Sequence, residues 1–173
     1  MRSIGDGPDP ADEEEKEVDQ AMTAEHAGEA LESEVLEIPS PLADEMIEHC
    51  RAGRPNEACG IIAGAGGRLT KVFKMTNAAA SPVRYSLEPK EQLAVYNTLE
   101  DNGWELAGVF HSHTRTEPLP SPTDIRLASE DVPYVIVSLA TDDPEIRAWR
   151  IRKRTWTDEE GEVEEVPVVV TDL

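Results

Sequence analysis

The stretch that decides the fold runs from Leu106 through Ala-Gly-Val-Phe-His-Ser to His113. Its first five residues form an apolar run, which predicts a buried strand. Because residues two apart on a strand point the same way, His111 and His113 share one face and Ser112 points to the other. Asp124 returns after a proline-rich loop. Two imidazoles and one carboxylate make a three-ligand set of the kind found in catalytic zinc sites, which keep the fourth position for water.

Each half of this pattern also has a plain structural interpretation. A His-x-His pair on a strand is often only two strand histidines. Ser121-Pro122-Thr123-Asp124 predicts a helix start, with Ser121 as N-cap, proline at the first helical position and an acid at the third. The two interpretations of Asp124 are compatible, because a capped first turn holds its carboxylate still. Two of the four histidines lie together at the end of one apolar strand, so the combined pattern favours a metal site.

The acidic groups are distributed unevenly. The chain has 173 residues, enough for one domain with a substantial core, and a formal net charge of −20. Residues 1–37 carry thirteen acidic side chains against Arg2 and Lys16. Because residues 1–33 are also poor in large apolar groups, we predict an acidic disordered tail over 1–33 and a catalytic domain over 34–173. The tail could gate the site or recruit a partner, but such a charge run is more often simply solvated.

Charge and cysteine content limit the function classes. An acidic chain disfavours unassisted binding to nucleic acid and suits a salt-adapted cytoplasm or a basic partner. Cys50 and Cys59 do not make a disulfide framework, and buried free thiols are the default interpretation. No charged-then-apolar signal region opens the chain, and no apolar run approaches transmembrane length. We therefore expect a soluble cytoplasmic protein without membrane contact. The sequence leaves the oligomeric state open, a homodimer included.

Hydrophobic periodicity predicts an α/β (α+β) domain built on a mixed sheet. Leu93, Tyr96 and Leu99 are expected on the buried face of the second helix, Leu127 is expected to pack inward, and Trp149 to be partly exposed. The predicted helices cover 40–52 and 89–102, with a short one after Asp124, and the predicted strands cover 34–38, 57–64, 68–76, 106–113, 134–139, 145–151 and 163–170. Pro167 indicates that the last strand lies at an edge.

The histidine stretch and the residues around it resemble a known family. His111-Ser112-His113, seven residues, Ser121, two residues and Asp124 are similar to the JAMM motif of the MPN+ (Mov34/MPN/PAD-1) zinc metallopeptidases. That family needs an upstream glutamate, and Glu57, in Pro-Asn-Glu-Ala-Cys-Gly, stands in the matching context. The resemblance runs from about Leu36 to the C-terminus. It implies the MPN/JAMM fold, a curved mixed β-sheet flanked by helices in a cytidine-deaminase-like arrangement.

The resemblance also implies a division of labour among the site residues. His111, His113 and Asp124 would bind one catalytic Zn2+, Glu57 would act as general acid/base, and Ser121 would donate to the oxyanion. Such a zinc lowers the pKa of its water to about 7. The neighbouring Cys59 is an alternative nucleophile, but no base is placed near it in sequence, so we expect it to line the core.

Within the family the chain looks closest to small prokaryotic peptidases of ubiquitin-like sulfur-carrier proteins. The local match extends to Met75-Thr76-Asn77-Ala78, to Ser81-Pro82 and to Glu91-Gln92-Leu93. These relatives cleave after the C-terminal Gly-Gly of the carrier and release cysteine, in cysteine biosynthesis. The alternative is an isopeptidase that removes ubiquitin-like modifiers from protein lysines, as deubiquitinases and desampylases do. The short interval after Asp124 lacks the larger insertions of eukaryotic deubiquitinases, which favours a small carrier or a short leaving group.

Two further classes compete with an enzyme. Non-catalytic MPN scaffolds usually lose metal ligands, whereas this chain keeps all of them. A purely structural metal needs a closed four-ligand site, and no fourth His or Cys is near in sequence. A nucleobase deaminase also combines His, Glu and zinc, but its Pro-Cys-x-x-Cys element is absent. The zinc metallopeptidase activity that the resemblance implies therefore stays the expected function.

Overall fold

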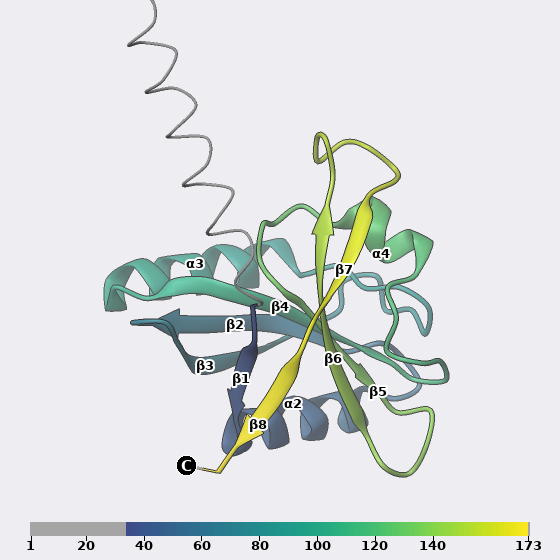
Figure 1. Ribbon diagram of the computed structural model, residues 1–173, viewed down its shortest axis with the longest axis horizontal. Coiled ribbons are helices and arrows are strands. Elements are labelled where there is room, and N and C mark those ends of the chain that lie inside the picture. Colours follow the sequence, from purple (N-terminus) through teal and green to yellow (C-terminus); the bar gives the residue numbers. More distant parts are fainter. Residues whose placement is uncertain (1–33, 173) are drawn as a thin grey trace, which may run out of the picture. The chain divides into compact units, whose positions relative to one another are not determined.

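The computed structural model describes residues 34–172, which contain eight strands and three helices. The predicted tail over 1–33 lies outside the described residues. The elements in chain order (Figure 1) are β1 (Leu36–Pro39), α2 (Ser40–Gly53), β2 (Cys59–Ala65), β3 (Arg68–Met75), α3 (Pro89–Asn102), β4 (Glu105–His113), α4 (Pro122–Leu127), β5 (Tyr134–Ser138), β6 (Glu145–Arg152), β7 (Glu162–Val166) and β8 (Val168–Thr171).

Six strands form a mixed sheet in the order β3-β2-β4-β5-β6-β7. Every neighbouring pair is antiparallel except β4 and β5, which run parallel. A parallel pair needs a crossover connection, and here that connection contains α4. A separate parallel pair joins β1 to β8. The mixed α/β architecture predicted from the sequence is thus confirmed.

Helices cover both faces of the large sheet, with α2 on one side and α3 and α4 on the other (Figure 1). Met46 and Cys50 of α2 pack in one core with Phe110 of β4. Leu99 of α3 packs in a second core with Ile61 of β2. Because side chains alternate along a strand, the histidines that follow Phe110 at odd positions point to the α3 and α4 side.

Three side-chain predictions were wrong. Leu93 is 62% exposed, because at about 100° per residue it lies roughly 120° around α3 from Leu99. Leu127, the last residue of the short helix α4, is 54% exposed. Trp149 is only 8% exposed, since its indole N–H donates to the carbonyl of Pro118 at 2.8 Å in the loop that covers this side of β6.

The predicted last strand over 163–170 is interrupted at Pro167. The residues before it form β7, which ends the six-stranded sheet, and those after it form β8, which pairs with β1. Proline has no N–H to donate to a ladder, but its carbonyl accepts a 2.8 Å hydrogen bond from the backbone N–H of Leu36. One predicted strand is therefore two strands in different sheets.

Candidate metal centre

Four buried polar side chains meet at the end of β4. His111 and His113 are the seventh and last residues of that strand and are 1% and 7% exposed. Asp124, 7% exposed, lies in the first turn of α4, at the carboxyl ends of the parallel pair β4 and β5. Glu57, 3% exposed, comes two residues before Cys59, which pairs with His111. Crevices at the carboxyl ends of parallel strands are common ligand sites in α/β proteins.

The ligand atoms of these four residues lie within 4.8 Å of one another. Nε2 of His111 is 3.2 Å from Nε2 of His113, and both nitrogens approach Oδ2 of Asp124, at 3.2 and 3.0 Å. The carboxyl group of Glu57 completes the group. Two imidazoles and two carboxyl groups held this close are able to bind a metal ion, since both residue types are common ligands of divalent cations.

A capping box at α4 fixes Asp124. The Ser121 hydroxyl accepts a hydrogen bond from the Asp124 backbone N–H at 3.1 Å, and Oδ2 of Asp124 accepts one from the Ser121 N–H at 2.9 Å. Pro122 occupies the first helical position, where its missing N–H costs nothing. The helix start predicted from Ser121 to Asp124 is confirmed, and the same carboxylate belongs to the buried cluster.

The two imidazoles are held in different ways. Nδ1 of His113 lies 2.8 Å from the carbonyl oxygen of Glu117. A carbonyl only accepts, so Nδ1 donates its proton there, and Nε2 is the ring nitrogen that faces the cluster. Nδ1 of His111 is buried and has no hydrogen-bond partner among the described residues. Its ring is stacked on Tyr85 instead, with centroids 4.3 Å apart and planes inclined by 22°.

The Glu57 carboxyl is the acid of the cluster whose pKa is raised, whereas the pKa of Asp124 is lowered. Burial, and then the neighbouring Asp124 carboxylate, raise the pKa of Glu57 to about 8, although His113 lowers it in part. Oε2 of Glu57 has no hydrogen-bond partner among the described residues, so no hydrogen bond at this oxygen offsets its loss of water. A carboxyl whose pKa lies near neutrality can accept a proton and release it again, as general acid–base chemistry requires.

Burial and hydrogen bonds also shift the pKa values of His111, His113 and Asp124. Burial opposes charge on His111, and the pKa of this imidazole is lowered in spite of its contact with Asp124. Burial acts in the same direction on His113, but the hydrogen bonds to Asp124 and to the Glu117 carbonyl outweigh it and raise the His113 pKa. Burial alone would raise the pKa of Asp124, yet the two histidines and the Ser121 N–H hold it far below the usual range. The carboxylate therefore stays ionised.

Contacts outside the cluster keep its backbone in place. Ser112 points away from the histidines, as predicted, and its hydroxyl accepts a 2.8 Å hydrogen bond from the Ala58 backbone N–H. Asn77 donates to the carbonyl of Glu57 at 2.9 Å, and the Glu57 N–H donates to the carbonyl of Ser81 at 2.9 Å. Both strands that deliver the cluster are thus joined to each other and to the loop that follows β3.

Sequence reasoning did not single out Tyr85 or Asn77 as site residues. Asn77 lies in a segment that matched the family, but the match gave it no role. Tyr85 falls in a short extended piece without periodicity, and no spacing links it to His111. An aromatic residue stacked on a ligand-type histidine leaves no signal in a single sequence.

The thiol alternative does not fit the structure. Cys50 and Cys59 are free and fully buried. Burial raises the pKa of each thiol to about 12, so a thiolate nucleophile is unavailable at neutral pH. The expectation that Cys59 lines the core is confirmed.

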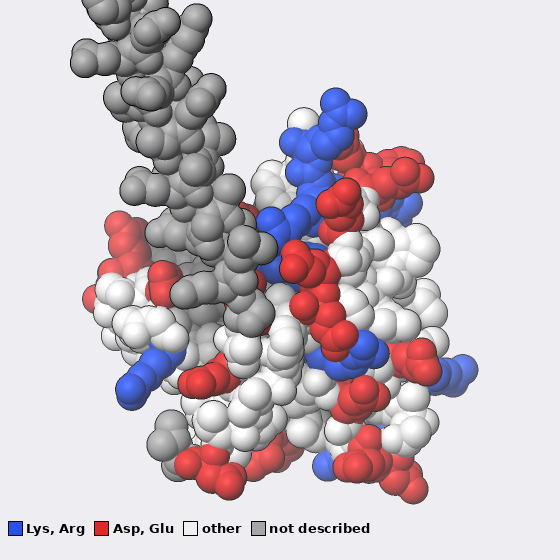
Figure 2. Space-filling view, viewed as in Figure 1, with Lys and Arg blue, Asp and Glu red and all other residues white. Residues whose placement is uncertain are grey.

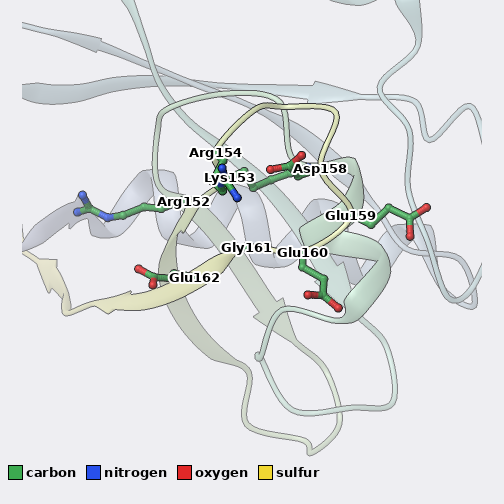
Figure 3. Close-up of a pocket in the computed structure, with 8 residues that line it drawn as sticks. All are labelled: Arg152, Lys153, Arg154, Asp158, Glu159, Glu160, Gly161 and Glu162. Atoms are coloured by element: carbon green, nitrogen blue, oxygen red, sulfur yellow. The ribbon is translucent and has the colours of Figure 1, made fainter.

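A surface hollow lies apart from the buried cluster. It measures about 840 Å³ and is lined by residues 152–154 and 158–162, in the β6–β7 connection. The charged ends of Arg152, Glu159 and Glu160 point in different directions (Figure 3). The ammonium of Lys153 donates to the carbonyls of Arg126, Ala128 and Trp156. Basic groups at this end of the molecule adjoin acidic ones (Figure 2), so the hollow offers no uniform charge to a ligand.

Helices within residues 34–172 are too short or too polar to cross a membrane.

Comparison with known proteins agrees with the geometry. Residues 39–152 match the model of the prokaryotic homologs of the JAB domain. The chain is 42% identical over 144 residues to the CysO-cysteine peptidase of Mycobacterium tuberculosis, covering 80% of this chain and 92% of that protein. It is 33% identical over 106 residues to a desampylase of Haloferax volcanii, covering 57% and 76%. The solution structure of a Desulfitobacterium hafniense protein superposes with a TM-score of 0.70 at 32% identity, covering 80% and 94%. The chain therefore belongs to the family of prokaryotic JAB-domain homologues.

Proposed function

We propose that this protein is a zinc-dependent peptidase that cleaves after the C-terminal Gly-Gly of a small ubiquitin-like sulfur-carrier protein and releases cysteine. The observation that carries the proposal is the buried cluster of Glu57, His111, His113 and Asp124, whose ligand atoms lie within 4.8 Å of one another. A hydrolase needs polar groups of this kind in a place where bulk water does not compete with them.

His111, His113 and Asp124 are the proposed zinc ligands. Three atoms bonded to one tetrahedral zinc at about 2.0–2.1 Å lie roughly 3.3 Å from each other. Their three mutual distances here are 3.0–3.2 Å, which supports a site that needs little rearrangement to bind zinc. The bound zinc would polarise the scissile carbonyl and lower the pKa of a water molecule to about 7.

Glu57 is the proposed general acid/base. It would take a proton from the attacking water as the new C–O bond forms, and deliver it to the leaving nitrogen as the C–N bond breaks. Its raised pKa and its unpartnered Oε2 support this role. A cation beside the carboxyl would bring its pKa down from about 8 and leave it able to act as a base near pH 7. Proton transfer of this kind contributes about 10²–10⁴ in rate.

Ser121 is the proposed oxyanion donor. Its oxygen already accepts the Asp124 N–H, so its own O–H is left to donate. That proton would meet the carbonyl oxygen as negative charge develops on it. Because Ser121 also caps α4, Ser121→Ala removes a cap as well as a donor. The helix-cap contribution is about 1 kcal/mol of stability, whereas the donor contributes about 10²–10³ in turnover.

The substrate proposal is supported by similarity. The CysO-cysteine peptidase of Mycobacterium tuberculosis is 42% identical to this chain across 92% of its own length. The connection between α4 and β5 spans only residues 128–133, which leaves no long insertion to grip a large modifier. A small carrier with a single cysteine on its C-terminus does not need such an insertion.

One digestion followed by intact-mass analysis tests the proposal. The substrates are a Gly-Gly-ending carrier that bears a C-terminal cysteine and the same carrier joined to a lysine side chain, each with and without chelator. We expect chelator-sensitive loss of cysteine by the wild type, loss of turnover with retained zinc in Glu57→Gln, and unchanged turnover in Glu100→Gln, a matched change at an exposed glutamate of α3. Equal cleavage with and without chelator, or normal turnover by Glu57→Gln, would contradict it.

A second candidate is an isopeptidase that removes ubiquitin-like modifiers from lysines. The 33% identity to the Haloferax volcanii desampylase favours it. Cleavage of the lysine-linked carrier in the same digestion, alone or beside the cysteine-bearing one, would identify this activity.

A further inference from the structure

Tyr85 lies against the buried imidazole of His111. Their ring centroids are 4.3 Å apart, and the planes are inclined by only 22°, which is a stacked arrangement. The loop that carries Tyr85 follows β3 and precedes α3. The contact thus joins a loop residue to a proposed ligand at the end of β4.

The stack replaces a hydrogen bond that a metal-binding histidine commonly makes. Such a histidine usually donates its second ring N–H to a carboxylate or carbonyl, and this fixes the ring orientation. His113 follows the rule, because its Nδ1 lies 2.8 Å from the Glu117 carbonyl. His111 does not, since its Nδ1 has no hydrogen-bond partner among the described residues. The orientation of its ring is therefore set by the Nε2 contacts to Asp124 and His113 and by the stack on Tyr85.

The backbone on both sides of Tyr85 is held by the side chain of Asn77. The Asn77 amide group donates to the Arg84 carbonyl at 3.0 Å, and its oxygen accepts the Ser86 N–H at 3.0 Å. The same amide donates to the Glu57 carbonyl at 2.9 Å. One asparagine side chain therefore connects the backbone on both sides of Tyr85 with the backbone of the proposed general base.

We propose that Tyr85 is a positioning residue whose ring, and not its hydroxyl, fixes the plane of His111 so that Nε2 points into the metal cluster. The inference rests on the proposed function, because it concerns a zinc ligand. The hydroxyl makes no hydrogen bond to another residue in the part of the chain that the structure describes, so phenylalanine should serve equally well. Neighbouring groups that orient metal ligands typically contribute 10–100-fold to metal affinity.

Zinc affinity of three variants, measured by competition with a chromophoric chelator, tests the proposal without a substrate. We expect Tyr85→Phe to bind zinc as the wild type does and Tyr85→Leu to bind it about 10–100-fold more weakly. Tyr96→Leu is the matched control, because Tyr96 is a partly buried tyrosine of α3 whose hydroxyl contacts Gln92 and Glu130 rather than the cluster. Its zinc affinity should not change.

Spectra of the cobalt-substituted proteins give a second readout. A turned His111 ring should alter the visible cobalt bands of Tyr85→Leu, while those of Tyr85→Phe and Tyr96→Leu stay like the wild type. If Tyr85→Leu does not fold, as judged by circular dichroism and urea unfolding, Tyr85→Met keeps a long apolar side chain without the ring and takes its place.

Two results would overturn the inference. Equal zinc affinity and cobalt spectra in the wild type and the ring-less variant would show that the stack does not orient His111. Loss of turnover in Tyr85→Phe at unchanged zinc affinity would show that the hydroxyl acts on the substrate. A wild type that binds no zinc would instead refute the proposed function, so the two failures are distinguishable.

Discussion

Replacing Glu57 by glutamine tests whether burial sets the protonation of this carboxyl. In the metal-free protein the folded-state pKa is about 8 against an ordinary value of 4.5. A raised acid pKa means that folding takes up a proton, so the cost of burying Glu57 is absent below pH 4.5 and grows as the pH rises toward 8. At about 1.36 kcal/mol per pKa unit, the wild type should lose about 3 kcal/mol of stability between pH 5 and pH 8 through this residue alone.

Glu57→Gln cannot ionise and should not show that loss. Its buried amide adds a cost of about 1–3 kcal/mol, but this cost is the same at both pH values and cancels in the comparison. Urea unfolding with chelator at pH 5 and pH 8, on the wild type and the variant, measures the difference between the two pH dependences. The variant should be relatively more stable at pH 8. If both proteins lose the same stability between the two pH values, burial without a hydrogen bond at Oε2 does not raise the pKa of Glu57.

Three further changes have defined outcomes. Asp124→Ala should abolish zinc binding and turnover together and lower stability by about 1 kcal/mol through the lost cap, as judged by metal analysis, digestion and urea unfolding. Gly60→Ala should destabilise the protein by about 3 kcal/mol in urea unfolding, because a Cβ there would overlap the Phe73 carbonyl and the Phe110 ring; an unchanged midpoint would contradict the packing. Ser112→Ala leaves a buried backbone N–H unpaired and should cost about 1–3 kcal/mol, and normal stability would mean that this hydrogen bond contributes little.

Local chemistry made some features predictable from the sequence alone. Ser121 and Asp124 form a capping box because the side chains of a helix N-cap and of the third helical residue reach each other's backbone N–H in any helix. Ser112 points away from its two histidine neighbours because a strand alternates. Both features depend on residues near in sequence, and both also place side chains of the site.

Features that depend on distant packing were missed. Burial of Trp149 requires the loop around Pro118 to lie over β6, 31 residues away in sequence. Exposure of Leu93 depends on which side of α3 meets the sheet. The stack of Tyr85 on His111 joins two segments separated by a whole helix. Periodicity describes one element at a time and carries no information on such pairs.

The sequence positions of the four cluster residues determine how the site should respond to partial unfolding. His111, His113 and Asp124 fall within one short span, so the chain entropy needed to bring them together is small. Glu57 lies more than fifty residues earlier and reaches them only through the pairing of β2 with β4. Mild denaturant that opens this pairing should move Glu57 away from the cluster before the three proposed ligands release their metal. Inactivation would then precede zinc release, and the intermediate would be an inert protein that still holds its ion.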